Sequence, residues 1–497
     1  MKVTTVAGVS DLIQEALAAY RDDPAAVEAL EGWAARLSEP LRIAVAGMVK
    51  AGKSTLLNAI IGEEIAPTDT GECTRIVTWY RFAHSPRIML HPVAGEPRPL
   101  PLRRSNGRLV FDLGRDRAED VERLVVEWPS ESLRNVTLID TPGIASLSGD
   151  VSARSVNFLT PADSPSEADA IVYLMRHMHA ADLRFLESFK DTEAGRSGTV
   201  NALAVLSRAD EIGAGRIDSL LSAGEIAERY RRDPGLRKLA LGVVPVAGLL
   251  AQSARSMRQS DYESLALLST LDRAERERLL LSADRFLRAA IPDGLTAEAR
   301  KQLLERFGLF GIRLAVVLIR AGFTDPTPLA HELARRSGLD PLLAMLAGQF
   351  HARADALKAR TALVGVETLL RNSPRDGTGH LATALERLQI NAHEFRELGL
   401  LATLRTTGVT LKHELAVEAE RIIGGEGVAA HLRLGLEPEA SRDEISAEAH
   451  RVLHRWRLLA ENPLTDRSAL DVCRVVVRSC EGILAEAAGL HLHKQPA

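Results

Sequence analysis

Apolar residues at helical spacing open the chain and predict two helices within residues 1–38. In the second helix, apolar side chains recur every three or four positions, at Val27, Leu30, Trp33 and Leu37. Pro24 suits the first turn of that helix, where no backbone N–H is required. A pair of amphipathic helices must bury its apolar faces, so we expect a partner surface for residues 1–38 elsewhere in the chain.

Short apolar runs that predict β-strands alternate with helical patterns between residues 41 and 246. Residues 41–46 predict a buried strand, and residues 53–61 predict a helix. The further predicted strands are 76–82, 87–91, 109–113, 124–128, 136–139, 170–174, 200–206 and 241–246. Strands that alternate with helices indicate an α/β domain with a mainly parallel sheet. The segment 76–128 breaks the alternation, which predicts antiparallel edge strands there.

The chain beyond residue 250 shows helical patterns and no further convincing strand. We expect Asp340 to cap a long helix that runs to Arg371. Ser441 and Glu444 predict a capping box for a later helix, and Thr465 is the expected cap of the last one. The sequence therefore predicts an α/β domain followed by an all-helical region.

Composition narrows the class of protein without changing this division. The 497 residues suffice for two or three domains, and 46% hydrophobic with 26% charged residues is typical of a globular protein. A formal charge of −4 argues against a nucleic-acid partner. Three cysteines are too few for a disulfide framework, which fits a reducing cytoplasm. No signal peptide is recognisable, and two arginines interrupt the most apolar stretch, 309–323, so we expect no transmembrane span.

A glycine-rich motif follows the first predicted strand. Residues 47–54 read Gly-Met-Val-Lys-Ala-Gly-Lys-Ser and match the phosphate-loop pattern in its required place, between a strand and a helix. Backbone N–H groups and the positive end of the following helix would hold the phosphates. Lys53 would reach the β- and γ-phosphates, and Ser54 would bind Mg²⁺. The predicted contacts to nucleotide here are Gly47, Met48, Val49, Lys50, Ala51, Gly52, Lys53, Ser54 and Thr55.

A second motif, Asp140-Thr-Pro-Gly143, ends another apolar strand. A carboxylate at this place in phosphate-loop proteins holds Mg²⁺, and we assign that role to Asp140. Gly143 would offer its backbone N–H to the γ-phosphate. Thr74 is the best candidate for a threonine that completes the Mg²⁺ shell when the γ-phosphate is present, with Thr68 and Thr70 as rivals.

The sequence Ser207-Arg208-Ala-Asp210 ends a third apolar strand and predicts which base is bound. GTPases usually carry Asn or Thr, then Lys, any residue and Asp at this point. Asp210 would accept hydrogen bonds from guanine N1 and N2, which adenine cannot supply, so an ATPase is a less favoured alternative. Arg208 replaces the usual lysine and can still stack on the base, while Ser207 is a weaker match. Ala247 and Gly248, after the last strand, would back the guanine with main chain.

The order of these motifs resembles that of dynamin-superfamily GTPases. Lys53 and Asp140 are 87 residues apart, far more than in small Ras-like GTPases. The phrases that look like bacterial dynamin-like proteins extend over nearly the whole chain, at 50–62, 66–70, 74–79, 207–218 and 303–308. The resemblance implies a GTPase domain in residues 39–350 with a helical insertion at 255–336. It also implies a helical-bundle neck made by residues 1–38 and 351–497, with a shortened or absent trunk.

The resemblance also implies an activity, the slow conversion of GTP to GDP and phosphate with Mg²⁺. Hydrolysis would rise when two GTPase domains form a homodimer. The protein would be cytoplasmic, would act on membrane lipid at the inner face of the plasma membrane, and would have a longer dynamin-like protein as partner. The alternative is a regulatory GTPase switch without direct membrane activity.

One departure from the dynamin pattern lies inside the phosphate loop. In eukaryotic dynamins two side chains there help to position water and hold a cation, and the matching residues here are Val49 and Lys50. The Val49 side chain cannot form hydrogen bonds. Lys50 would place a positive charge near the β–γ bridge, or else would point to solvent. The resulting catalytic candidates are Lys53, Thr74 and Lys50.

Overall fold

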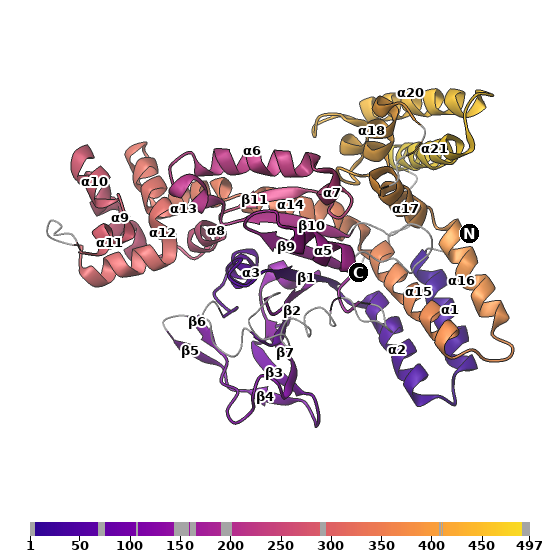
Figure 1. Cartoon of the computed structure of the whole chain (residues 1–497), viewed down its shortest axis with the longest axis horizontal. Coiled ribbons are helices and arrows are strands. Elements are labelled where there is room, and N and C mark those ends of the chain that lie inside the picture. The colour runs from indigo at the N-terminus through magenta and orange to yellow at the C-terminus, as the bar shows by residue number, and fades with distance from the viewer. Residues whose placement is uncertain are drawn as a thin grey trace.

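The computed structural model describes residues 5–67, 75–105, 108–143, 159, 166–189, 201–288, 295–406, 409 and 411–489. These residues form three parts in a row (Figure 1). A sheet domain, here called the head, lies in the centre. A group of helices from residues 255–336, the insertion, lies at one end, and a set of bundled helices, the neck, lies at the other.

The head is built on a sheet with the strand order β11-β10-β9-β1-β8-β2-β7-β3-β4. Its first five strands are parallel, namely β11 Val243–Val246, β10 Ala202–Ser207, β9 Ala170–Met175, β1 Leu41–Gly47 and β8 Val136–Asp140. The other four pair antiparallel, except for the parallel pair β2–β7: β2 Val77–Phe82, β7 Val121–Trp128, β3 Arg87–Pro92 and β4 Arg98–Leu100. The predicted mainly parallel sheet with antiparallel edge strands is therefore confirmed.

One predicted strand, 109–113, is mostly wrong. Only Arg108–Val110 (β6) is extended, and it pairs with Arg103–Ser105 (β5) in a small separate hairpin. Phe111 is buried in the core of the head. The chain then turns, because the Asp112 carboxylate accepts a hydrogen bond from the backbone N–H of Gly114. This side-chain contact replaces the ladder that a strand would need.

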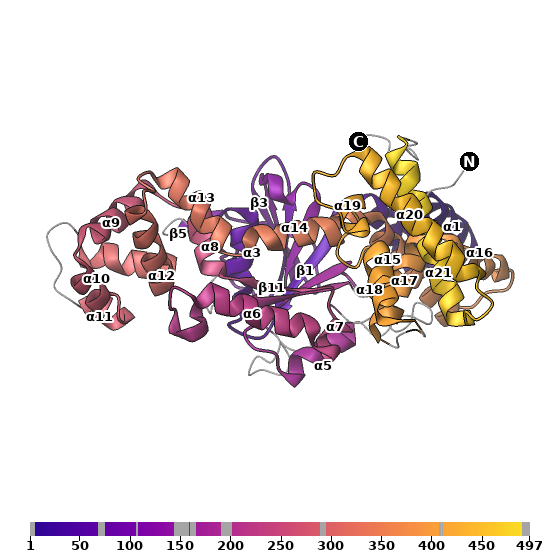
Figure 2. The same ribbon diagram turned by 90° about the horizontal axis from the view of Figure 1, so that it is seen from above.

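Helices cover both faces of the sheet (Figure 2). Alternation in β1 sends Ile43 and Val45 to one face and Ala44 and Ala46 to the other. The first face packs on α3 Lys53–Ile61, α8 Gly248–Arg255 and α14 Leu339–Gln349. The second face packs on α5 Ala180–Phe189, α6 Ser219–Arg232 and α7 Pro234–Arg237. Both faces of the parallel strands are thus buried, as a parallel sheet requires.

The insertion has a hydrophobic core of its own. Its helices are α9 Gln259–Thr270, α10 Arg273–Leu279, α11 Ala283–Arg288, α12 Ala297–Arg320 and α13 Pro326–Arg336. Helix α12 is kinked at Gly308, where φ is 62° and ψ is 173°. It lies against α8, so the core of the insertion continues onto the head.

The neck combines the two ends of the chain. α1 Thr5–Ala19 and α2 Pro24–Ser38 pack on α15 Ala354–Asn372 and α16 Gly379–Asn391 in one core. A second core joins α17 His393–Thr406, α18 His413–Ile422, α19 Ala430–Leu434, α20 Arg442–Glu461 and α21 Arg467–Ala487. The apolar faces of α1 and α2 are buried in this way. Among the described residues, no helix is both long enough and apolar enough to span a membrane.

The long helix expected from Asp340 to Arg371 is divided in two. α14 starts at Leu339 after the N-cap Gly338 and ends at Gln349, and a short turn precedes α15. Arg353, buried in this turn, donates hydrogen bonds to the Gln349 side chain and to the backbone carbonyl of Gly424. A contact with a loop 71 residues away thus interrupts a continuous helical pattern.

Two predicted helix caps can be compared with the structure. The capping box of Ser441 and Glu444 is confirmed. The last helix is capped by Asp466 instead of Thr465, because the Asp466 carboxylate accepts from the N–H of Ala469.

Candidate nucleotide-binding site

The predicted site residues come from the carboxyl ends of four of the five parallel strands, β1, β8, β10 and β11, which share one edge of the sheet (Figure 1). The phosphate loop follows β1, and Asp140 is the last residue of β8. Ser207 is the last residue of β10, and Gly248 lies two residues after β11. Ligands of open α/β sheets bind at this edge.

The phosphate loop wraps tightly around the start of α3. Gly47 has φ 148°, and a Cβ there would stand 2.3 Å from the carbonyl oxygen of Leu174. Gly52, the N-cap of α3, has φ 94° and also favours glycine. The turn is closed by a 3.1 Å hydrogen bond from Ala51 N–H to the Met48 carbonyl. The positive end of α3 therefore points into the loop, as anion binding requires.

Lys53, Ser54 and Asp140 form the polar centre beside the loop. Ser54 Oγ donates a 3.0 Å hydrogen bond to Asp140 Oδ2, and Lys53 Nζ lies 3.3 Å from the Gly47 carbonyl oxygen. Asp140 Oδ1 is buried and has no hydrogen-bond partner among the described residues.

The pKa values of the two charged groups reflect this buried setting. Burial raises the pKa of Asp140 to about 6, against the opposing effects of the Lys53 charge and the Ser54 hydrogen bond. Burial lowers the pKa of Lys53, and the Asp140 carboxylate partly offsets this. Burying a carboxylate oxygen without a hydrogen-bond partner costs free energy, and a cation bound to that oxygen would offset the cost.

Gly143 lies directly against the phosphate loop. A Cβ at Gly143 would stand 2.7 Å from Val49 Cγ2 and 3.2 Å from the Val49 nitrogen. Any larger residue would therefore push the loop away, which explains glycine after Asp-Thr-Pro. Thr141 holds the segment in place, because its hydroxyl donates to the Val45 carbonyl.

A cavity of about 190 Å³ joins the phosphate loop to the end of β10. The loop and α3 contribute Ala51, Gly52, Thr55 and Leu56, and the other walls are Leu174, Val205, Ser207, Arg208, Asp210, Glu211, Val246, Gly248 and Leu249. The phosphate loop, which we predicted to bind phosphate, and the segment of Asp210, which we predicted to bind the base, thus line the same cavity.

Arg208 and Glu211 line this cavity, and Arg176, which does not line it, binds Glu211. Arg208 Nη1 donates to Glu211 Oε1 at 2.7 Å, and Arg176 Nη2 donates to Glu211 Oε2 at 2.7 Å. Arg208 has φ 52°, a backbone conformation that few side chains adopt. Burial raises the pKa of the neighbouring Asp210 carboxyl.

Two predicted base contacts, Ser207 and Ala247, have polar groups that already form hydrogen bonds within the protein. The Ser207 hydroxyl donates to the Met175 carbonyl at 3.3 Å, so it ties β10 to β9. The N–H of Ala247 donates to the Ser337 carbonyl at 2.8 Å, and Ala247 does not line the cavity, whereas Gly248 does. Glu211 and Leu249 line the cavity although no motif marked them. Their adjacency to Asp210 and Gly248 is the only sequence signal that could have found them.

Two predicted catalytic residues remain to be placed. Lys50 is exposed, with φ 63°. Thr74 and its rivals Thr68 and Thr70 lie outside the described residues.

A parallel sheet with a phosphate loop after β1 and a carboxylate at the end of β8 defines a P-loop nucleotide-binding head. Residues 43–204 match the model of the dynamin family. The chain is 42% identical over 484 residues to the isoniazid-induced protein IniC of Mycobacterium tuberculosis, covering 96% of this chain and 98% of that protein. This chain belongs to the bacterial dynamin-like proteins, a family that has a GTP-binding domain.

A more distant relative and a solved structure can be aligned with this chain. A bacterial dynamin-like protein of Nostoc punctiforme is 30% identical over 162 residues, which are 30% of this chain and 22% of that protein. A solved structure of an oligomerised bacterial dynamin pair, described in terms of long-range sensing and tethering of membranes, aligns with 94% of this chain and 88% of that one. That alignment has 13% identity and a TM-score of 0.31.

Proposed function

We propose that this chain binds GTP in the cavity at the carboxyl edge of the sheet and hydrolyses it. The observation that carries the proposal is a cavity lined by both phosphate-loop residues and Asp210. Asp210 would accept hydrogen bonds from guanine N1 and N2. Arg208, tethered by Glu211, would lie over the base. Gly248 would contribute main chain to the base, in preference to Ala247 with its occupied N–H.

The phosphates would lie over the start of α3. The N–H groups of the loop and the helix dipole attract negative charge there. Lys53 would exchange its contact with the Gly47 carbonyl for the β- and γ-phosphates. Gly143, in contact with Val49, would turn its backbone toward the γ-phosphate and so sense its presence.

Asp140 and Ser54 fit a Mg²⁺ ion. The buried Asp140 Oδ1 lacks a partner among the described residues, and the Ser54 hydroxyl lies beside the other oxygen. Mg²⁺ takes one or two protein oxygens and completes its shell with phosphates and water, so this small donor set suffices. When bound, the ion would neutralise charge on the phosphates. Thr74 is proposed as a further ligand in the GTP state.

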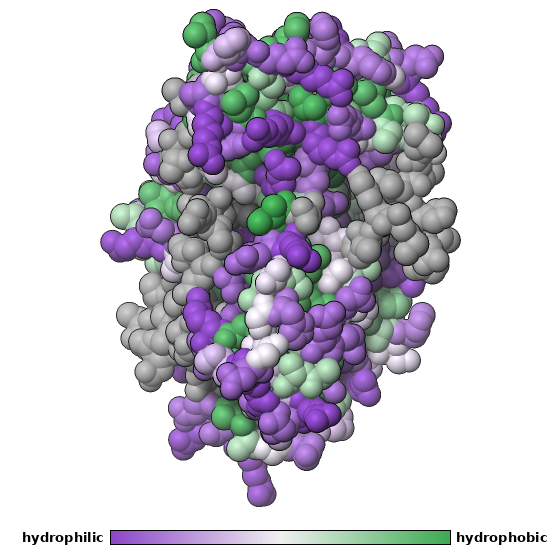
Figure 3. Space-filling view, turned by 90° about the vertical axis from the view of Figure 1, so that its right-hand side faces the viewer, coloured by the Kyte–Doolittle hydropathy of each residue, from purple (hydrophilic) through white to green (hydrophobic). Residues whose placement is uncertain are grey.

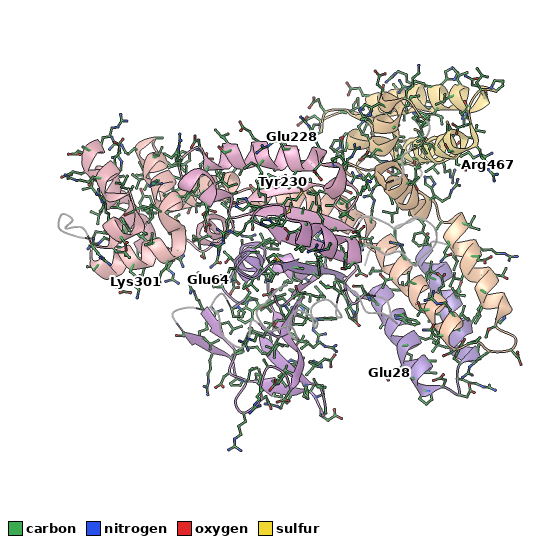
Figure 4. All side chains as sticks on the ribbon, in the orientation of Figure 1. Glu28, Glu64, Glu228, Tyr230, Lys301 and Arg467 are labelled. Carbon is green, nitrogen blue, oxygen red and sulfur yellow. The ribbon has the colours of Figure 1, made fainter. Side chains whose placement is uncertain are left out.

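A direct test compares nucleotide binding by the wild type, one variant of the phosphate loop and one control variant. Lys53→Ala should weaken GTP binding at least a hundredfold, since a buried charge aimed at the phosphates is lost. Lys301→Ala, on the insertion surface (Figure 4), is the matched control and should bind like wild type. Equal binding by all three proteins, measured by calorimetry with GTP and Mg²⁺, would contradict the proposal.

We further propose that hydrolysis is slow in isolated heads, rises when two heads associate, and serves membrane remodelling or maintenance. Membership of the dynamin-like family supports this part. In the presence of a GTP transition-state analogue, a measurement of molecular size should show a dimer. Turnover per head should rise with protein concentration; a flat dependence would count against head-to-head association.

Membrane action separates this proposal from a regulatory GTPase switch that binds a longer dynamin-like partner. Viewed from the neck end, hydrophilic side chains predominate, with smaller hydrophobic patches between them (Figure 3). Liposomes of anionic lipid should carry the protein into the pellet more strongly with a GTP analogue than with GDP. If the protein stays out of the pellet with both the GTP analogue and GDP, the regulatory switch is favoured.

A further inference from the structure

Helix α12 of the insertion reaches the segment that carries Asp210. Arg313 Nη1 donates a 2.5 Å hydrogen bond to the Gly215 carbonyl, while its Nε donates to the Leu280 carbonyl at 3.2 Å. Gly215 follows the segment Ala209–Ala214, in which Asp210 is the second residue and the backbone leaves the helical region at Ile212 and Gly213. Arg313 therefore fastens the far end of this segment to the insertion.

The surroundings of Gly215 include both the Asp210 backbone and helix α12. A Cβ at Gly215 would stand 3.5 Å from the Asp210 carbonyl oxygen, 3.8 Å from Arg313 Nη1 and 4.0 Å from Phe310 Cβ. The backbone of Asp210 and helix α12 thus both lie beside the same glycine. A shift of Gly215 would move the Asp210 backbone, and with it the carboxylate proposed to read guanine.

The same helix also contacts the segment that follows α3, the helix that begins at the phosphate loop. Arg306, almost fully buried, forms an ion pair with Glu64 at 3.0 Å and another with Asp261 at 3.2 Å. Glu64 follows the end of α3 and faces the insertion (Figure 4). Arg255 of α8 adds a second tie, because it donates to the Ala59 carbonyl within α3 at 3.1 Å. The C-terminal end of the phosphate-loop helix is therefore anchored to α12 through Glu64 and to α8 through Arg255.

The kink in α12 touches a third wall. A Cβ at Gly308 would stand 3.4 Å from Leu249 Cδ2, and Leu249 lines the cavity. With φ 62°, Gly308 redirects the helix between Arg306 and Arg313. One kinked helix thus contacts the segment after α3, the α8 wall and the segment that carries Asp210.

We infer that α12 acts as a spacer between the phosphate and base ends of the nucleotide site, and that Arg313 is a positioning residue for guanine discrimination by Asp210. The inference rests on the proposed binding of guanine by Asp210. Arg313 touches no nucleotide in this assignment. It acts by holding Gly215, so its loss loosens the Asp210 segment while the phosphate contacts remain.

The test measures binding of GDP and of inosine diphosphate, whose base lacks the 2-amino group. Calorimetry with Mg²⁺ would compare wild type, Arg313→Met and the control Arg320→Met. Arg320 lies on the same helix and donates to the Ser269 carbonyl inside the insertion, away from the nucleotide segments. Arg313→Met should raise the Kd for GDP roughly tenfold and that for inosine diphosphate less than threefold, as expected for a charged donor that couples two sites.

Several outcomes distinguish positioning from mere support of the fold. If Arg313 only stabilises the fold, both Kd values rise by the same factor, and the inference is overturned. If Arg320→Met lowers discrimination as much as Arg313→Met does, the effect is not specific to Gly215 and the inference also fails. A wild type that binds both nucleotides equally would instead overturn the proposed guanine site itself.

A conservative variant keeps the test valid should Arg313→Met fail to fold. Arg313→Lys retains the charge, but a single ammonium group on a shorter reach cannot hold the Gly215 and Leu280 carbonyls as the guanidinium does. It should lower the GDP preference about threefold, between wild type and the methionine variant. An unchanged preference in a folded Arg313→Lys protein would overturn the inference.

Discussion

Arg36 in the neck and Asp169 at the base of β9 form an ion pair of 2.9 Å, with both side chains almost completely buried. The Asp169 carboxylate also accepts from the Arg42 N–H at the start of β1 and from the Thr361 hydroxyl of α15. The pair thus joins two neck helices to the amino ends of the strands. The candidate nucleotide site lies at the opposite ends of the same strands, so β1 and β9 connect the two directly.

Asp169→Asn should destabilise this joint strongly. The substitution leaves the Arg36 guanidinium buried without a countercharge, which costs about 3–5 kcal/mol in comparable pairs. Glu167→Gln is the matched control, because Glu167 pairs with Arg42 at 2.7 Å but is 46% exposed. It should cost less than about 1 kcal/mol. Urea denaturation followed by circular dichroism measures both, and equal midpoints for the two variants would refute the assignment.

Glu397 predicts how the neck responds to acid. Burial raises the pKa of its carboxyl, but hydrogen bonds from His393 and Ser479 and the charge of Arg433 outweigh this and lower it to about 2. Between this value and the ordinary 4.5, the unfolded chain binds more protons than the folded one. The stabilisation is therefore complete above pH 4.5 and is lost as the pH falls toward 2.

Glu397→Gln tests this contribution. At pH 7 it should lower the free energy of unfolding by an amount on the order of 3 kcal/mol, and its difference from wild type should shrink as the pH falls toward 3. The exposed Glu439→Gln should match wild type throughout. Denaturant midpoints across this range measure the difference, and a gap that stays constant with pH would show that Glu397 does not titrate as described.

Asp210→Asn should change which base is bound. An amide offers a donor where guanine N1 needs an acceptor, and xanthine presents the complementary oxygen at C2. The variant should lose GDP affinity at least tenfold and gain affinity for xanthosine diphosphate. Asp218→Asn, an exposed change eight residues on, should leave both affinities unaltered. If both bases weaken equally, Asp210 serves the loop structure alone.

The phosphate loop, Asp140 and Asp210 could be found in the sequence because each stands at or just after the carboxyl end of a strand whose apolar run is easily recognised. Each of these motifs is recognised from its own residues and from the strand directly before it, which lie within a short stretch of the chain. Contacts between distant segments could not be found in this way. Arg353 breaks the helix after Gln349 because of a loop near Gly424, and Arg313 reaches Gly215 across 98 residues. Neither arginine stands in a motif, and each acquires its contact only in the folded chain.

Substitutions at Lys50 can distinguish the effect of its charge on hydrolysis from the effect of its backbone conformation on the loop. It is exposed and has φ 63°, which asparagine also tolerates. Lys50→Asn therefore removes the charge while keeping the loop, and Lys50→Arg keeps the charge. If the charge stabilises the transition state, Lys50→Asn should lower kcat for GTP at least tenfold, with the Kd for GDP changed less than threefold.

Single-turnover measurements at saturating GTP isolate this step from product release. Lys50→Arg should retain most of the activity, since a guanidinium can occupy the same side of the β–γ bridge. If Lys50→Asn hydrolyses GTP at the wild-type rate, the side chain plays no part in the chemistry. Its left-handed conformation would then serve only to shape the loop around the phosphates, and the rate would depend on Lys53 and on association of the heads.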